Sequence, residues 1–406
     1  MKVLHTSDWH LGQQFYEHSR HAEHQFFLDW LCDTLTSYQI NVLIVSGDIY
    51  HSATPSAMAE QQLYTFIKRV KMSNPGLHIV ITAGNHDSAN RIETAKPLLS
   101  QFDTHVVGRF DKHNPQDVIK TLATEQGTLQ VVAMPFLRSA DLDSQPDDPL
   151  AYQQGVERAY HAAYQSLDDQ HPVLAMGHLH AKGGSISGDS ERNITIGGFD
   201  AITASVFGER PDYVALGHLH KAQKVAGSES IRYCGTPLPM SFSERNYRHQ
   251  VLLVEFSDNA LSGVKPLDVP RLKPVILLPE RGGATLDELL DLLSELDLSD
   301  YQDKPEATPY LRLRLNASDT DSQFRIKIEQ ALTDKRVHFC GIERISTTQQ
   351  SMDTPYFEDL GQVEKLEPMR LLELAYEAHI DSEQPVPDAL QNCLMQVLAS
   401  VQEQEV

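Results

Sequence analysis

The chain has 406 residues, of which 41% are hydrophobic and 22% are charged, and its formal net charge is −22. This length predicts two or three domains, because a single hydrophobic core stops growing well below it. The excess of acidic residues argues against a broad basic surface for nucleic acid, although a local groove around a metal centre could still bind DNA.

No apolar run is long enough to cross a membrane, and the charged Asp8 follows the first residue too closely for a signal peptide. The cysteines lie far apart and form no CxxC pair, so we expect buried free thiols at Cys32, Cys234, Cys340 and Cys393. Both features favour a protein of the cytosol.

Five short apolar runs, typical of buried strands, are each followed by side chains that can bind a metal. Asp8 and His10 follow the first run and are two residues apart, which places them on the same side of an extended backbone. Helical patterns at 23–35 and 56–70 separate the first runs, so the sequence predicts βαβ units and a largely parallel sheet. Functional groups gather beyond the carboxyl ends of such strands. The polar clusters at the five ends contain Asp8, His10, Asp48, Asn85, His86, Asp87, His178, His218 and His220.

Each cluster also has a structural interpretation. A Gly–Asp pair such as Gly47–Asp48 is mostly a turn, and a Gly–His pair is more often structural than a metal ligand. The occurrence of all five clusters together, each at the end of an apolar run, favours the functional interpretation.

The candidate ligands are two Asp, one Asn and four His, with no thiolate among them. Oxygen and imidazole ligands suit Mn²⁺, Fe²⁺, Mg²⁺ or Zn²⁺, and this number of ligands is too large for one ion. One bridging carboxylate with three further ligands on each side predicts two metal ions, which would activate water for an in-line displacement at phosphorus. His86 directly follows Asn85, so we expect it near the metals as a general acid or as a donor to a phosphate oxygen.

These motifs, in the order D-x-H, G-D, G-N-H-D, G-H and G-H-x-H, resemble those of the calcineurin-like metallophosphoesterases. The stretches LHTSDWHLGQ, PFLR, DYVALGHLHKAQ and RYCGTPLPMSFSE resemble more narrowly the SbcD family of bacterial nuclease subunits, which are relatives of the Mre-type double-strand-break nucleases. The resemblance covers most of residues 1–270 and rests only on element order after them. It implies an α/β fold with a two-sheet core flanked by helices, a small α/β capping domain and a C-terminal helical hairpin.

The resemblance also implies a role for each candidate residue. The implied sets are Asp8, His10 and His220 on one metal, Asn85, His178 and His218 on the other, Asp48 as the bridge and His86 as the proton donor. His180 could compete with His178, but His178 follows a Gly as His218 does and is preferred. His51 could orient a DNA strand, and a surface-loop histidine is an equally good interpretation.

The expected domains are a metallophosphoesterase nuclease domain at 1–270, an α/β capping domain at 271–346, and a linker with C-terminal helices at 347–406 that binds an ATPase partner. The capping domain is predicted as a β-α-β-α-β unit. Its basic side chains could contact phosphates or could form a solvated face: Arg312, Arg314, Arg325, Lys327, Lys335 and Arg336. The last helical pattern has an apolar stripe suited to a groove or a coiled coil, formed by Leu390, Cys393, Leu394, Val397, Leu398 and Val401.

The resemblance implies the nuclease component of an SbcCD-type complex, with ATP-dependent 3′→5′ exonuclease activity on duplex DNA and endonuclease activity on single strands and hairpins. The implied roles are DNA recombination, replication and repair. The implied cofactors are two divalent ions, with Mn²⁺ preferred to Mg²⁺. The implied partners are DNA and an SbcC-type, SMC-like ATPase, in a heterotetramer that contains a homodimer of this chain. Helices expected at 56–71 and 90–101 are candidates for the dimer face, and the expected location is the cytoplasm, in association with the nucleoid.

Two other functions fit part of the sequence. One is a small-substrate metallophosphoesterase that acts on cyclic nucleotides or phosphoproteins, but GDIYHSA lacks the Arg that phosphatases of the superfamily usually have after the Gly–Asp pair. The other is a non-catalytic scaffold, which the complete set of candidate ligands argues against.

Overall fold

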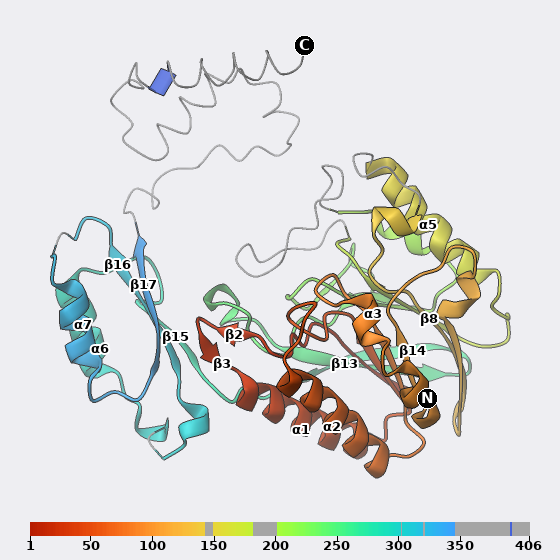
Figure 1. Ribbon diagram of the computed structural model, residues 1–406, viewed down its shortest axis with the longest axis horizontal. Coiled ribbons are helices and arrows are strands. Elements are labelled where there is room, and N and C mark those ends of the chain that lie inside the picture. Colours follow the sequence, from red (N-terminus) through yellow and green to blue (C-terminus); the bar gives the residue numbers. More distant parts are fainter. Residues whose placement is uncertain (143–148, 182–200, 302, 320, 346–389, 392–406) are drawn as a thin grey trace. The chain divides into compact units, whose positions relative to one another are not determined.

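The computed structural model of the protein describes residues 1–142, 149–181, 201–301, 303–319, 321–345 and 390–391 (Figure 1). The chain divides into two compact units, Met1–Leu315 with Asp321–Glu343, and Asn316–Thr320 with Arg344–Val406. The first unit contains the predicted nuclease domain and nearly all of the predicted capping domain, so the boundary at 271 stays a prediction. The predicted C-terminal hairpin and its apolar stripe lie outside the described residues, except for Leu390 and Gln391.

The first sheet is built around the strand that leads to Asp8 and His10. Four parallel neighbours confirm the predicted βαβ pattern here: β1 (Lys2–Thr6), β4 (Val42–Ser46), β5 (His78–Thr82) and β6 (Thr104–Val107). On the other side of β1, β13 (Gln250–Ser257) and β14 (Ala260–Asp268) extend the sheet in antiparallel pairing. The spatial order is β14-β13-β1-β4-β5-β6.

The second sheet has parallel strands in its centre and antiparallel strands at both edges. Its spatial order is β11-β12-β10-β9-β8-β7. The bounds are β7 (Ile119–Thr124), β8 (Gly127–Ala133), β9 (Val173–His178), β10 (Tyr213–Gly217), β11 (Gln223–Lys224) and β12 (Ile231–Tyr233). The carboxyl ends of β9 and β10 therefore lie side by side, because these two strands are parallel and paired up to Gly217 and His178.

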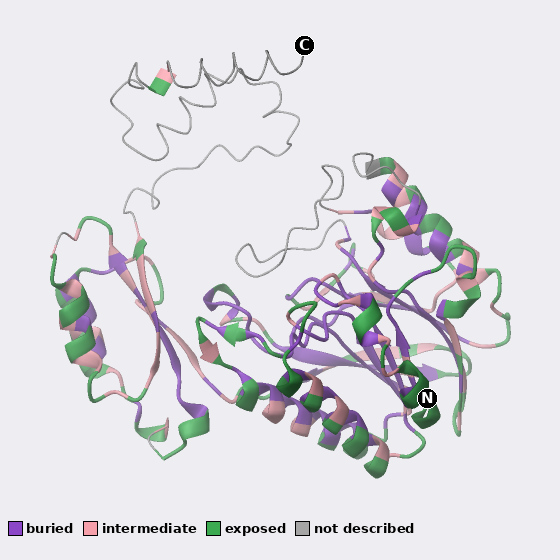
Figure 2. Cartoon of the chain, viewed as in Figure 1, coloured by how far each residue is buried: buried purple, intermediate pink, exposed green. Residues whose placement is uncertain are grey.

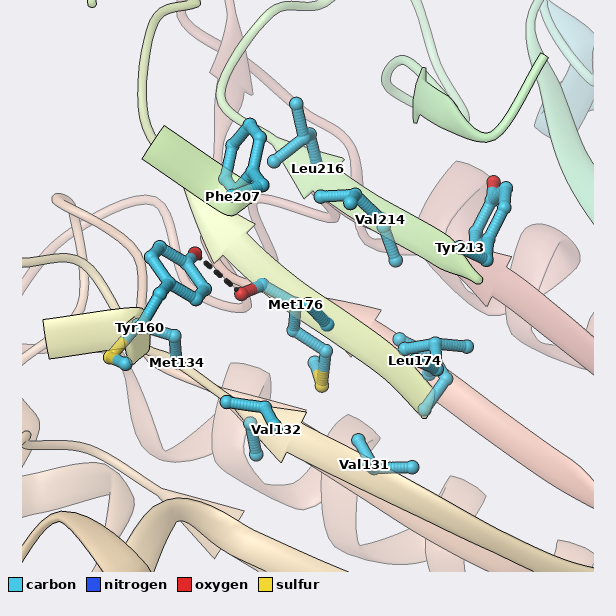
Figure 3. Packing of buried hydrophobic residues seen from close by; sticks show 14 of the residues in the cluster. Val131, Val132, Met134, Tyr160, Leu174, Met176, Phe207, Tyr213, Val214 and Leu216 are labelled. Carbon is cyan, nitrogen blue, oxygen red and sulfur yellow. Dashed lines mark hydrogen bonds between the residues drawn. The ribbon is translucent and has the colours of Figure 1, made fainter. Parts of the chain in front are cut away.

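The main hydrophobic core lies between the two sheets, and central strands such as β4, β9 and β10 are buried on both faces (Figure 2). Alternation along β4 explains this: Val42 and Ile44 belong to the core with the second sheet, whereas Leu43 and Val45 belong to a separate core on the other face. In Figure 3, the buried Tyr160 hydroxyl donates a hydrogen bond to the Met176 carbonyl (2.8 Å), which ties a helix to the centre of the second sheet. That helix is α5 (Pro149–Tyr164).

Two long helices, α1 (His21–Ser37) and α2 (Ala57–Ser73), cover the outer face of the first sheet (Figure 1). They confirm the helices predicted from apolar spacing at 23–35 and 56–70. Ser56 begins α2 as a cap, because its side chain accepts a hydrogen bond from the Ala59 amide (3.2 Å). A short hairpin, β2 (Gln14–Phe15) and β3 (His18–Ser19), precedes α1.

The continuous helix predicted at 90–101 is wrong. The structure has α3 (Ala89–Ile92), α4 (Lys96–Leu99) and a 3-10 turn, η1 (Ser100–Phe102). Pro97 lies in the first turn of α4, where its missing amide proton is tolerated, and it cannot continue a helix from Ile92 because it cannot donate to a preceding carbonyl.

The capping region is a small α/β unit, as predicted. Its strands are β15 (Val275–Leu278), β16 (Tyr310–Asn316) and β17 (His338–Ile345), in that spatial order, and its helices are α6 (Leu286–Glu295) and α7 (Phe324–Leu332). Alternate residues of β16 pack with both helices in one core. Three of the basic side chains for which both interpretations were open have acidic neighbours: Arg312 and Arg314 lie 3.9 and 3.4 Å from Glu343, and Lys327 lies 2.7 Å from Asp321.

Among the described residues, neither a disulfide nor a membrane span is found. Cys32, Cys234 and Cys340 are buried free thiols, as predicted, and Cys393 lies outside the described residues. Within the same ranges, no helix is long and apolar enough to cross a lipid bilayer.

Candidate metal centre

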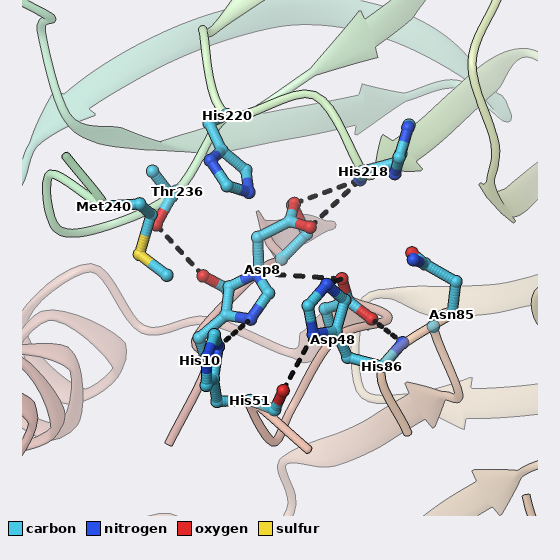
Figure 4. Close-up of polar contacts among 12 residues, drawn as sticks. Asp8, His10, Asp48, His51, Asn85, His86, His218, His220, Thr236 and Met240 are labelled. Atoms are coloured by element: carbon cyan, nitrogen blue, oxygen red, sulfur yellow. Dashed lines mark hydrogen bonds and ion pairs between the residues drawn. The ribbon is translucent and has the colours of Figure 1, made fainter. Parts of the chain in front are cut away.

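Loops at the carboxyl ends of strands from both sheets bring the predicted site residues together (Figure 4). The loops after β1 and β4 are tied to each other, because the His10 amide donates to the Asp48 carbonyl (3.0 Å). The loops contribute Asp8 and His10 after β1, Asp48 after β4, Asn85 and His86 after β5, His178 at the end of β9, and His218 and His220 after β10. The expected meeting of strand ends at one edge is therefore what the structure has.

The backbone at the site adopts conformations that side chains other than glycine rarely take. Asp8, His10 and Asp48 have φ values of 53°, 48° and 51°, and His218 has a φ of 103°. Left-handed backbone of this kind costs on the order of 1–3 kcal/mol per residue and persists where the surrounding structure fixes it. Four predicted metal ligands therefore have left-handed backbone, although residues outside the site, such as Tyr16 and Asp258, have it too.

Glycines allow close approach at this edge, between the two sheets at Gly217 and between two loops of the first sheet at Gly84. A Cβ atom on Gly217 would lie 1.9 Å from the Ser46 carbonyl oxygen, and one on Gly84 would lie 2.2 Å from Oδ1 of Asp48. Both distances are far below van der Waals contact, so neither position can accept a side chain without movement of the backbone. This gives a physical reason for the Gly that precedes several of the polar clusters.

Asp48 is at the centre of the cluster. Its Oδ2 atom lies 3.4 Å from Nε2 of His178, 3.7 Å from Nε2 of His10 and 4.0 Å from Nε2 of His86, while Oδ1 accepts a hydrogen bond from the His86 amide (2.8 Å). His178 comes from the second sheet and His10 from the first. The Asp48 carboxylate therefore lies between imidazoles from both halves of the core.

Asp8 is held on the other side of the cluster. Its carboxylate accepts hydrogen bonds from the His218 amide (3.0 and 3.2 Å) and from the Ser7 hydroxyl, and its carbonyl accepts one from the Thr236 hydroxyl (3.0 Å). Asn85 reaches the opposite side, where its Oδ1 atom lies 2.9 Å from Nε2 of His178.

The buried position of these groups changes their protonation. Burial raises the pKa of Asp8 to about 6. Burial acts in the same direction on Asp48, but the surrounding histidines, His178 first, hold the pKa of this carboxyl well below its usual range. The Asp48 charge in turn outweighs burial at His178 and raises the pKa of that imidazole to about 9. Burial keeps the pKa of His10 well below its usual range, so this ring is neutral and has a lone pair to offer.

The cluster fits a site for two divalent metal ions. Ligand atoms lie within 4.8 Å of one another in three groups: Asp8, His10 and His220; Asp8, Asp48 and His178; and His10, His51 and His86. In the described part of the chain, Nε2 of His10 is buried without a hydrogen-bond partner, as expected of an atom placed to bind a metal. The division of the ligands between two ions stays a prediction, and the third group is one that the sequence did not predict.

The sequence left the roles of His51 and His180 open, and the structure places these two residues differently relative to the cluster. The Nδ1 atom of His86 hydrogen bonds the His51 carbonyl (2.7 Å), and Nδ1 of His51 lies 3.5 Å from Nδ1 of His10, so His51 borders the cluster. The ring of His180 lies 6.3 Å from that of His218, centroid to centroid, while His178 is in contact with Asp48. This geometry favours His178 over His180 as the ligand.

Two buried carboxylates support the site in roles that the sequence analysis did not assign. Asp87 accepts backbone hydrogen bonds from Ile49 (3.1 Å), Tyr50 (2.9 Å) and Gly84 (2.8 Å), which locks together the loops that carry Asp48 and Asn85. Glu244 contacts His220 directly, since one of its carboxylate oxygens lies 2.9 Å from Nδ1 of that ring. Asp87 was visible in the G-N-H-D motif, whereas Glu244 lies 24 residues from its partner and has no local signal.

Comparison with known proteins agrees with this geometry. A family model described as Calcineurin-like phosphoesterase matches residues 1–222, and one described as Type 5 capsule protein repressor C-terminal domain matches residues 271–379. The fold is thus that of a calcineurin-like metallophosphoesterase, and the cluster of His and Asp side chains fits a dinuclear metal site.

Individual relatives narrow this class further. The SbcD component of the nuclease SbcCD from Rhodobacter capsulatus is 36% identical over 360 residues, which cover 84% of this chain and 87% of that protein. The corresponding SbcD protein of Escherichia coli K12 is 39% identical over 293 residues, which cover 68% of this chain and 70% of that protein. The chain belongs to the SbcD family of calcineurin-like phosphoesterases.

Proposed function

We propose that this chain is the nuclease component of an SbcCD-type complex and that it hydrolyses phosphodiester bonds of DNA with two divalent metal ions. The observation that carries the proposal is the position of the Asp48 carboxylate between His10 of the first sheet and His178 of the second. A carboxylate between two sets of ligands can bind both ions of a two-metal site.

The proposed ligand sets are Asp8, His10 and His220 for one ion and Asn85, His178 and His218 for the other, with Asp48 shared. When bound, the two ions lower the pKa of a water molecule and stabilise the attacking and leaving oxygens of an in-line displacement. Mn²⁺ is the proposed ion and Mg²⁺ is the second choice, because oxygen and imidazole ligands accept both.

His86 is the proposed proton donor to the leaving oxygen. Its Nδ1 atom must carry a proton to hydrogen bond the His51 carbonyl (2.7 Å), and this contact fixes the ring with Nε2 toward the cluster, 4.0 Å from Oδ2 of Asp48. A protonated Nε2 in that position can donate to an oxygen of the substrate.

The finer features of the function rest on the family. We propose 3′→5′ exonuclease activity on duplex ends and endonuclease activity on single strands and hairpins, within the cytoplasmic nucleoid. Affinity for DNA scales with the phosphates that Lys and Arg neutralise, so a chain with a net charge of −22 needs a DNA-binding surface from a partner. The proposed partner is an SbcC-type ATPase, bound through residues 347–406, in a heterotetramer that contains a homodimer of this chain.

One experiment tests the nuclease and separates it from a small-substrate phosphoesterase. The purified chain is incubated with a labelled DNA hairpin or with p-nitrophenyl phosphate, with Mn²⁺ or Mg²⁺, and with or without the ATPase. We expect Mn²⁺-dependent cutting of the hairpin that the ATPase and ATP stimulate. Efficient hydrolysis of the phosphomonoester without any cutting of DNA would overturn the proposal.

The partner proposal has its own test. Deletion of residues 367–406 is expected to leave Mn²⁺-dependent cutting of short single strands and to remove both co-purification with the ATPase and ATP-stimulated cutting of duplex ends. Leu394→Glu with Leu398→Glu is expected to do the same, because it places charge in an apolar interface. Co-purification of the truncated chain would show that the segment does not bind the partner.

A further inference from the structure

A buried carboxylate lies directly behind one of the proposed metal ligands. Glu244 has no exposed surface, and its Oε1 atom lies 2.9 Å from Nδ1 of His220. A carboxylate can only accept, so the proton is on Nδ1 and the Nε2 atom of His220 carries the lone pair that a metal requires. The other oxygen, Oε2, accepts a hydrogen bond from the Met240 amide (2.8 Å).

The segment that holds Glu244 is itself held by a buried arginine. Arg20 is 1% exposed and donates to the Pro239 carbonyl (2.7 Å) and to Oε1 of Gln13 (2.8 Å), while Nε2 of Gln13 contacts the Met240 carbonyl (3.4 Å). The Arg20 guanidinium also makes a two-pronged pair with Glu23, with distances of 2.9 and 3.2 Å. A bidentate pair between a guanidinium and a carboxylate fixes the orientation of both groups as well as their positions.

The capping region completes this network. The hydroxyl of Tyr310, the first residue of β16, donates to Oε2 of Glu23 (2.6 Å), although the two residues are 287 positions apart in the sequence. The Tyr310 ring packs on Phe15 with a centroid distance of 4.5 Å, and Phe15 packs on Phe242 at 5.2 Å. All three rings are buried in one apolar cluster, which joins β16 to the 3-10 turn η5 (Phe242–Glu244) that contains Glu244.

We propose that Glu244 is a positioning residue for His220, and that Tyr310, through Glu23 and Arg20, makes metal binding depend on how the capping region is seated. The proposal rests on the metal-binding role proposed above for His220. The carboxylate behind a metal-binding histidine typically changes metal affinity by about 10- to 100-fold. The continuous set of buried hydrogen bonds from Tyr310 to Glu244 gives the capping region a physical route to the same ring.

The test is titration of the metal-free chain with Mn²⁺, followed by calorimetry and by electron paramagnetic resonance, which reports the ligand field of each bound ion. The wild-type chain is expected to bind two ions. Glu244→Gln is expected to weaken one of them by about 10- to 100-fold and to change its spectrum. Tyr310→Phe, which removes only the hydroxyl, is expected to weaken the same ion on the order of threefold.

Matched controls separate positioning from general damage. Glu229→Gln removes an exposed carboxylate that pairs with Lys224 and Arg232, and Tyr38→Phe removes the hydroxyl of a half-exposed tyrosine; both are expected to bind Mn²⁺ as the wild type does. The double variant of Glu244 and Tyr310 is expected to lose no more affinity than Glu244→Gln alone, because both changes act on one network.

Each other outcome has a definite meaning. Unchanged Mn²⁺ affinity in Glu244→Gln overturns the positioning role, and unchanged affinity in Tyr310→Phe overturns the link to the capping region. If Glu244→Gln does not fold, as judged by circular dichroism, Tyr310→Phe decides the question alone. A wild-type chain that binds fewer than two Mn²⁺ ions overturns the proposed metal centre itself, which is a separate failure.

Discussion

His178 on the second sheet hydrogen bonds the carbonyl of Ser46 on the first sheet through its Nδ1 atom, at 2.9 Å. A carbonyl can only accept, so this contact fixes the proton on Nδ1 and directs Nε2 toward Asp48 (3.4 Å) and Asn85 (2.9 Å). The Ser46 hydroxyl donates to the Ala215 carbonyl (3.0 Å), which adds a second bond between the sheets. The geometry of the metal centre therefore depends on the packing of the two sheets, because ligands from both sheets meet only if the strand ends are in register.

The first prediction concerns the carboxylate between the two sheets. Asp48→Asn keeps the shape of the side chain and removes its charge, so it is expected to weaken Mn²⁺ binding. Mutation of a residue that only supports a metal ligand already lowers activity by up to about 100-fold. Loss of the shared ligand is therefore expected to lower hydrolysis of bis-p-nitrophenyl phosphate by more than about 100-fold. Asp169→Asn, at a side chain that is fully exposed, is the control. Activity near the wild-type level at saturating Mn²⁺ would exclude Asp48 as the shared ligand.

The second prediction concerns the proposed proton donor. His86→Gln is expected to lower turnover by about 10²- to 10⁴-fold while leaving Mn²⁺ stoichiometry unchanged, because a general acid acts on the leaving oxygen and not on the metal. Steady-state kinetics and Mn²⁺ calorimetry on the same sample check both parts. A parallel loss of bound Mn²⁺ would identify His86 as a ligand, in line with its place in the group with His10 and His51.

The location of the site could be predicted from sequence because its residues follow strands that the chain marks clearly. Each apolar run ends in a polar cluster, and parallel pairing of β1, β4 and β5 brings the ends of three runs to one edge without any further information. The same logic predicted α1 and α2 from apolar spacing. Local sequence patterns were therefore sufficient to predict both the helices and the loops that contain the candidate ligands.

Other features depend on contacts that no local pattern encodes. Antiparallel β13 and β14 join the first sheet from positions after 250, and Tyr310 meets Glu23 across 287 positions. Nothing in the local sequence distinguishes Glu244 from a carboxylate in an ordinary turn, and only the folded chain brings it next to His220. The helix predicted at 90–101 failed for the opposite reason, since a local property of Pro97, which the sequence itself shows, breaks the helix into two short ones.

The third prediction concerns the close approach of Gly84 to Asp48. In Gly84→Ala, the added methyl group would lie 2.2 Å from Oδ1 and 2.3 Å from the amide nitrogen of Asp48, so the loop must move. We expect a loss of stability on the order of 1–3 kcal/mol and weaker Mn²⁺ binding. Gly76→Ala is the matched control, because its added Cβ would meet nothing within 4 Å. Thermal unfolding and Mn²⁺ calorimetry on both variants give the comparison, and equal behaviour would show that the loop yields easily.

The last prediction is a pH dependence of stability that arises away from the metal centre. His5 lies fully buried in β1, with Nδ1 3.0 Å from the Tyr213 hydroxyl. Burial lowers the pKa of His5 to about 3, and the charge of Arg232 acts in the same direction, whereas an unfolded histidine has a pKa near 6.5. The folded state thus holds His5 neutral, so its contribution to stability is complete above about pH 6.5 and is lost as the pH falls toward 3.

Between pH 7 and pH 5 this difference in pKa corresponds to about 2 kcal/mol of lost stability from this one residue. His5→Gln removes the titration and keeps a polar side chain in the strand, so its urea midpoint, followed by tryptophan fluorescence, is expected to fall less between these two pH values than that of the wild type. Other titrating groups act equally in both proteins and cancel in the comparison. The exposed His113 provides the control, because His113→Gln is expected to keep the pH dependence of the wild type. Equal slopes for the wild type and His5→Gln would show that the folded protein accommodates a charged His5.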